Sequence, residues 1–114
     1  MEFYIPRKLM FKAWNKESKL LMRLDNINCT RGELVKKDHI ILQFTGIVDK
    51  QLEEIYEMDL VLIGSVKHVV LWSAERNGWT YVRVDKIGAP ADLTSDAARS
   101  MMRLCSYFES SGGS

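Results

Sequence analysis

The sequence has no long apolar run and almost no net charge. None of its uncharged stretches approaches the roughly 18 residues that indicate a membrane-spanning helix. Its 16 Lys and Arg residues nearly balance its 15 Asp and Glu residues, which gives a formal net charge of +1. The whole chain is therefore neither an acidic mimic of DNA nor a broadly basic nucleic-acid binder, and charge-driven binding requires a local patch.

Cysteines are also scarce, and the two present, Cys29 and Cys105, lie far apart. The N-terminal stretch MEFYIPRKLM lacks the basic-then-apolar order of a signal peptide. We therefore expect reduced thiols in a soluble cytoplasmic protein without membrane contact. The chain has 114 residues, 46% of them hydrophobic, which predicts a single domain over residues 1–109 and a flexible tail over residues 110–114.

Motifs for catalysis or cofactor binding are missing as well. His39 and His68 have no Cys or His neighbour at the close spacing of a zinc site. The sequence contains no glycine-rich phosphate loop and no nucleophile elbow. The crowded carboxylates from Asp49 to Asp59 fit a solvated acidic face better than a buried general acid. We expect a protein that is not an enzyme and that uses no cofactor or metal.

Strand-like segments make up most of the chain. Residues 8–14 and 19–25 flank a polar NKES stretch and predict a hairpin. A hinge at TRGEL leads to a β-branched run that we expect to stop at Gly46.

Three further runs, over residues 59–64, 67–72 and 79–84, predict an antiparallel meander. Asn77-Gly78 supplies turn residues that tolerate positive φ, so Trp72 and Trp79 are expected near the same end of a hairpin.

Two segments have helical features. Asp49 is a candidate N-cap for a short helical turn near residues 50–56. Residues 95–109 have Thr94 or Ser95 as a candidate cap and place their apolar residues on one helical face, but a strand stays an alternative. The predicted fold class is mainly β (α+β): a small, antiparallel, barrel-like sheet domain with a short helical turn and a C-terminal helix or strand.

Two blocks of sequence resemble a known family. FKAWNKESKLL, and LQFTGIVDKQLEEIYEMDLV further along, are similar to the YopX family of small proteins encoded by bacteriophages and other mobile elements. The matching residues are Phe11, Ala13, Trp14, Gln43, Phe44, Thr45, Gly46, Asp49, Lys50, Ile55, Tyr56, Glu57, Asp59 and Val61. The resemblance implies an accessory protein that acts in the cytoplasm of an infected or host bacterial cell and binds a host or defence protein.

The chain departs from the family pattern at two glycines. One is replaced around Glu53 and the other is Met58. If the second position requires positive φ, methionine costs about 1 kcal/mol there.

We expect the shared motif to be mainly a folding device that joins two strands of a small barrel. Its residues are Trp14, Thr45, Gly46, Asp49, Tyr56, Glu57 and Asp59. Trp72 and Trp14 each close an apolar strand and are expected in the core.

The candidate binding residues lie in the run WTYVRV. Alternation places Trp79, Tyr81 and Arg83 on one face, and Arg76 in the adjoining turn extends it. If exposed, this strip is a stacking platform for bases or an anchor for a protein. The alternative is that both aromatic residues form the core face of a barrel strand.

Three functions fit these observations. The first is capture of a host or defence protein, the second is nucleic-acid binding through the Trp79 strip, and the third is binding of a small ligand. The pattern does not specify an oligomeric state.

Overall fold

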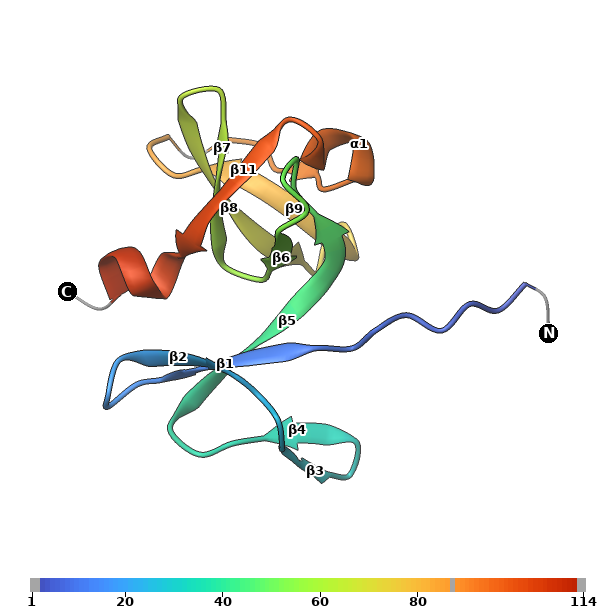
Figure 1. Ribbon diagram of the computed structural model, residues 1–114, viewed down its shortest axis with the longest axis vertical. Helices are drawn as coiled ribbons and strands as arrows, with labels where there is room; N and C mark the ends of the chain where they lie inside the picture. Colours follow the sequence, from blue (N-terminus) through green and yellow to red (C-terminus); the bar gives the residue numbers. More distant parts are fainter. Residues whose placement is uncertain (1–2, 87, 113–114) are drawn as a thin grey trace.

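The computed structural model describes residues 3–86 and 88–112, and it is built almost entirely of antiparallel strands (Figure 1). The strands are β1 Phe11–Asn15, β2 Leu20–Arg23, β3 Asn28–Thr30, β4 Glu33–Val35, β5 His39–Val48, β6 Glu54–Tyr56, β7 Asp59–Ile63, β8 Val66–Ser73, β9 Gly78–Arg83, β10 Ala91–Asp92 and β11 Met101–Ser106. Helical structure in the described residues is limited to α1 Ser95–Ala98 and the π-helical segment η1 Phe108–Gly112. The expected mainly β fold class is confirmed.

The strands form two sheets and a separate hairpin. One sheet has the order β2-β1-β5-β6, and the other has the order β10-β9-β8-β7-β11. The long strand β5 runs from the first sheet into the second half of the molecule, where the five-stranded sheet curls into a half-barrel (Figure 1). The β3–β4 hairpin lies at the opposite end from this half-barrel (Figure 1).

Two predicted strand arrangements are confirmed. Strands β1 and β2 form the N-terminal hairpin, and the Asn15 side chain accepts hydrogen bonds from two backbone N–H groups of the turn at 2.9 and 3.1 Å. Strands β7, β8 and β9 form the meander, with Trp72 directly opposite Trp79. Asn77 has a φ of 52°, as its turn position requires.

The predicted hinge around residues 30–34 is instead a tight hairpin. Thr30 and Glu33 are paired, so Arg31 and Gly32 form a two-residue turn with φ values of 52° and 83°. Positive φ at both central residues is the type I′ geometry that matches the twist of two paired strands.

The expected end of β5 at Gly46 is wrong. The strand continues to Val48, and its register with β6 shifts between Phe44 and Val48. Gly46 has a φ of 86°, a conformation open to glycine, so the residue bends the strand in a bulge without ending it.

The expected short helix near residues 50–56 is also wrong. Asp49 does accept backbone hydrogen bonds, from Gln51 and Glu53, but these close a tight turn. The next residues, Glu54–Tyr56, form β6 against β5. Pairing with the neighbouring strand overrides the short helical pattern.

Residues 95–109 combine both alternatives that the sequence left open. Thr94 caps α1 by accepting the Ala97 N–H at 3.0 Å, but the helix ends at Ala98. Residues Met101–Ser106 then pair with the edge of β7, which a longer helix would leave unpaired. Residues 110–112 of the predicted tail belong to η1, and residues 113–114 lie outside the described residues.

The core lies inside the half-barrel. Its buried residues are Ile55, Val61, Val70, Leu93, Ala98 and Met101. Trp14 is also buried, as expected, and stacks on Phe108 of η1 with ring centroids 5.8 Å apart. This contact and the continuous β5 strand connect the two sheets.

Candidate functional site, an aromatic cleft between the two sheets

The candidate site is a cleft that is lined by two tryptophans. This cleft has a volume of about 280 Å³. Its lining residues are Arg7, Gln43, Glu57, Trp72 and Trp79. They come from the N-terminal segment, β5, the turn after β6, and the β8–β9 hairpin, so residues far apart in sequence meet there.

The two tryptophans form the apolar part of the cleft. Their rings pack edge to face, with centroids 5.1 Å apart and planes at 80°. Trp79 is half-buried and packs against the core, whereas Trp72 is 47% exposed. The expectation that Trp72 belongs to the core is therefore wrong, because nearly half of its surface is exposed at the edge of the cleft.

Glu57 and Gln43 form the polar part. The Glu57 N–H donates to the Gln43 carbonyl at 2.9 Å, and the Gln43 N–H donates to Glu57 Oε1 at 3.4 Å. Burial raises the pKa of Glu57, and the Gln43 N–H opposes that rise. A half-buried carboxylate beside two indole rings is suited to a cationic or hydrogen-bond-donating group on a partner.

The predicted binding residues do not all come together. Trp79 lines the cleft, but Arg76 donates to Asp92 and to the Pro90 carbonyl, both at 2.9 Å. The exposed strip proposed from the sequence is therefore not continuous, since Arg76 is held against the β10 side of the sheet.

Tyr81 and Arg83 share the face of Trp79 but lie further along β9. Tyr81 is half-buried, packs against the core and contacts the His68 ring edge to face at 5.5 Å. Arg83 makes two hydrogen bonds of 3.0 Å to the Asp85 carboxylate. The expectation of an exposed aromatic strip is corrected at Tyr81, where the core-face alternative describes the structure.

Thr45 and Asp49 hold the bent part of β5. Thr45 Oγ1 donates to the Ile55 carbonyl at 2.7 Å across the Gly46 bulge. Asp49 accepts the backbone N–H groups of Gln51, Glu53 and Arg103 at 2.7–2.9 Å. Burial opposes ionisation of this carboxyl, but the three donors outweigh it and lower the pKa of Asp49.

Asp59 anchors the turn between β6 and β7. Its carboxylate is 1% exposed and accepts the Tyr56 N–H at 2.8 Å and the Arg103 Nε–H at 2.8 Å. Burial raises the pKa of Asp59, although both donors favour the carboxylate. The Lys12 ammonium group lies 4.3 Å from the centre of the buried Tyr56 ring. These contacts describe a folding device, with Glu57 as the motif residue that reaches the cleft.

The two missing family glycines correspond to strained positions in this chain. Met58 has a φ of 67°, so this position does adopt the left-handed conformation. The first glycine was placed around Glu53, but the strained residue is Leu52, with a φ of 66°. In the family pattern this glycine lies three residues after the matched Asp49 and three residues before the matched Ile55. That position is Leu52, which corrects the placement by one residue.

Gln43 and Arg7 were not predicted as site residues, and Glu57 was predicted as a mainly structural residue of the motif and not as a lining residue of a cleft. Gln43 and Glu57 both match the family sequence pattern, and this match was the available signal. Polar residues of the motif do not all stabilise the turn, so some of them are free to line a site. Arg7 lies in a segment whose path the sequence does not specify.

Within residues 3–86 and 88–112, no three His, Cys, Asp or Glu side chains gather closely enough to hold a metal ion. The described helices are all too short and too polar to cross a membrane.

Fold and site together define a small, mainly β domain with an aromatic cleft at the junction of its two sheets. Residues 4–101 match the family model described as YopX protein, and the chain belongs to the YopX family. The crystal structure of protein EF1440 from Enterococcus faecalis is similar, with a TM-score of 0.64 and 14% identity. The similarity covers 91% of this chain and 96% of that chain, and it shows a shared fold. No curated protein matches this sequence significantly.

Proposed function

We propose that this chain is a non-enzymatic accessory protein of a bacteriophage or other mobile element, and that it captures a host or defence protein through the aromatic cleft. The observation that carries the proposal is the exposed Trp72 ring beside Trp79 and Glu57. Tryptophan dominates binding energy where a partner removes it from water. The mobile-element setting follows from family membership.

The charges around β9 favour a protein partner over nucleic acid. Arg76 and Arg83, the two cations of the strip predicted from the sequence, are each paired with a carboxylate at 2.9–3.0 Å. The cleft itself is lined by one cation, Arg7, and by the Glu57 carboxylate, so it is not the basic groove that a phosphate backbone requires. Nucleic-acid binding is therefore a weaker alternative.

The size of the cleft favours a partner side chain over a free small molecule. Its volume of about 280 Å³ falls just under the range of roughly 300–1,000 Å³ that is typical of small-molecule pockets. An aromatic or cationic side chain from a protein surface fits this space and meets both the indole rings and the carboxylate.

The experiment is capture from a bacterial lysate by the tagged chain, followed by mass spectrometry. We expect one protein to be retained by the wild-type chain and lost with Trp72→Ala. Val35→Ala is the matched control, because Val35 is 48% exposed and lies in the β3–β4 hairpin away from the cleft (Figure 1).

Retention of the same protein by Trp72→Ala, with the fold intact by circular dichroism, contradicts the proposal. Salt-sensitive retention of oligonucleotides by the wild-type chain, with no protein captured, supports the nucleic-acid alternative, since phosphate contacts release counterions.

A further inference from the structure

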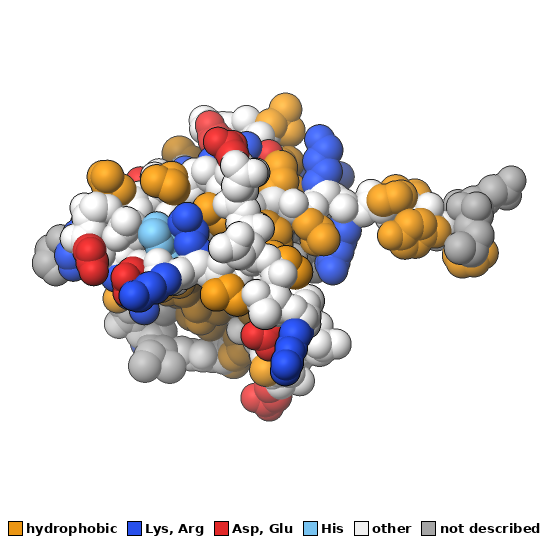
Figure 2. All heavy atoms as spheres, turned by 90° about the horizontal axis from the view of Figure 1, so that it is seen from below, with side chains coloured by type: hydrophobic (Ala, Val, Ile, Leu, Met, Phe, Trp, Pro, Cys, Tyr) orange, Lys and Arg blue, Asp and Glu red, His pale blue; other side chains and the backbone are white. Residues whose placement is uncertain are grey.

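The N-terminal segment leaves the body as an extended arm. In Figure 2 it projects from the rest of the molecule with hydrophobic side chains surrounded by solvent. Phe3, Tyr4 and Ile5 are 86%, 62% and 85% exposed. Pairing with the sheet begins at Met10, whose carbonyl accepts the Phe44 N–H at 2.8 Å. Three large apolar residues in a row, held away from their own core, are a costly exposure for a soluble chain.

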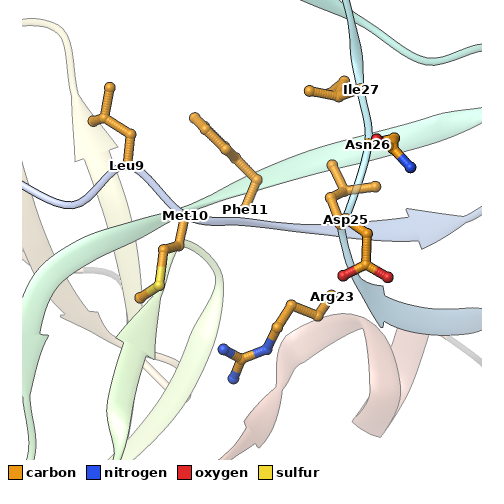
Figure 3. A pocket seen from close by; sticks show the side chains of 8 residues that line it. Leu9, Met10, Phe11, Arg23, Asp25, Asn26 and Ile27 are labelled. Carbon is orange, nitrogen blue, oxygen red and sulfur yellow. The ribbon is translucent and has the colours of Figure 1, made fainter.

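An apolar notch of about 340 Å³ lies at the base of this arm. Leu9 and Phe11 point to the same side of the chain, and Ile27 faces them from the segment after β2 (Figure 3). Leu24 also lines the notch, and Asp25 contributes a carboxylate. Leu9 is 58% exposed, so the notch is open to an incoming apolar segment.

We propose that two copies of this chain exchange their arms, so that the apolar segment Phe3–Ile5 of one copy lies against the notch of the other. The arm and the notch are adjacent in sequence and both are apolar. Two chains that meet around a two-fold axis at the arms therefore place each arm against the base of the other. The result is a closed, self-complementary contact, which is the commonest symmetry of protein oligomers.

The length of the arm and the surface area that it can bury agree with arm exchange. An extended segment from Phe3 to Leu9 spans roughly 20 Å, at about 3.3 Å per residue. Burying three large side chains from each of two arms removes on the order of 1,000 Å² from water, which is about the lower limit for a specific interface. The notch is also lined by Arg23, Asp25 and Asn26, so it has the polar rim that is typical of protein interfaces. A second copy of the chain therefore supplies both the apolar arm and the apolar notch, and no other partner is required.

The first test is the mass of the full-length chain in solution, measured by sedimentation equilibrium at concentrations from about 1 to about 200 µM, where an interface of this size dissociates. We expect a dimer whose dissociation constant rises at least about tenfold with Ile5→Asp. Leu52→Asp is the matched control, because Leu52 is 79% exposed and lies in neither the arm nor the notch. A monomer throughout this range overturns the proposal, as does a dimer that Ile5→Asp leaves unchanged.

The second test locates the arm. In a Cys29→Ser background, a chain with Ile5→Cys is mixed with a chain carrying Ile27→Cys and oxidised. We expect a mixed disulfide in high yield, and a low yield when Leu52→Cys replaces Ile27→Cys. Random collision between chains favours disulfide formation at the more exposed position 52. A yield with Leu52→Cys that equals or exceeds the yield with Ile27→Cys therefore contradicts arm exchange. Trp72→Ala is expected to leave the dimer intact, which separates this inference from the proposed function.

Discussion

Met58 adopts a backbone conformation that residues with a Cβ disfavour. Its φ is 67°, yet its N–H donates to the Val70 carbonyl at 2.7 Å and its carbonyl accepts the Tyr107 N–H at 2.7 Å. The turn is therefore held by hydrogen bonds on both sides, and the residue cannot relax out of the strained region.

The first prediction is that Met58→Gly stabilises the fold by about 1 kcal/mol, because glycine has no Cβ to clash in the left-handed region. Thermal or urea unfolding measures the change. Met22→Gly is the control: Met22 lies in β2 without positive φ, so glycine there should destabilise the chain. If Met58→Gly lowers the melting temperature, packing of the methionine side chain outweighs the backbone strain.

The second prediction concerns the pH dependence of Asp49. Three backbone N–H groups lower its pKa in the folded chain, so its stabilising contribution is present above the unfolded pKa and is lost as pH falls through the folded pKa. Asp49→Asn is expected to cost about 2 kcal/mol at neutral pH, because charge-assisted hydrogen bonds are lost. The difference from wild type should shrink below about pH 4, near the unfolded pKa of aspartate. Urea unfolding at both pH values measures it, and a pH-independent difference contradicts the assignment.

At the scale of elements, β11 is the strand that ties the motif to the half-barrel. Its Arg103 donates a backbone hydrogen bond to Asp49 and a side-chain hydrogen bond to Asp59, so one residue joins the turn before β6 to the turn before β7. The Asp59 carboxylate is almost completely buried and depends on this guanidinium group.

The third prediction is that Arg103→Met destabilises the fold by about 3–5 kcal/mol, because it leaves a buried carboxylate without its charged partner. Adding Asp59→Asn to Arg103→Met should recover part of the loss, since the uncompensated charge is removed. Chemical unfolding of the two single variants and the double variant gives the coupling. Strictly additive effects would show that the two side chains do not depend on each other.

Much of the strand order could be predicted from sequence, and the failures have physical causes. The β1–β2 hairpin and the β7–β9 meander were predictable because alternation and turn residues are local signals. The strand at the end of residues 50–56 was not, and the choice between helix and strand over residues 95–109 stayed open, since pairing with β5 and β7 overrides their helix-like spacing. The turn at Arg31–Gly32 was misread as a hinge, although both residues adopt the positive φ of a tight hairpin.

The site was less predictable than the fold. Trp79 was singled out as a candidate binding residue and lines the cleft, but alternation cannot tell an exposed face from a core face, so both alternatives stayed open for Tyr81, which packs against the core. The residue spacing in the sequence did not predict that Arg76 and Arg83 form ion pairs with carboxylates. Gln43 and Glu57 come together in the cleft through their backbone hydrogen bond, a contact between separate segments that has no periodic signal.

At the scale of the whole molecule, the cleft lies where the two sheets meet and where the arm leaves the body. Arg7 of the arm base lines the cleft with Trp72, so an exchanged arm would lie beside the proposed capture site. A dimer formed in this way carries two clefts, and a partner with two copies of the recognised surface gains avidity without new contacts.

The most direct measurement is the affinity of the captured protein for the wild-type chain and for Trp72→Ala, by isothermal titration calorimetry. Loss of a tryptophan hot spot costs about 2 kcal/mol or more, so the dissociation constant is predicted to rise about 30-fold. Val35→Ala, equally exposed but distant from the cleft, is predicted to bind like the wild type. Equal dissociation constants for the wild-type chain and a folded Trp72→Ala variant would contradict the claim that the aromatic cleft is the capture site.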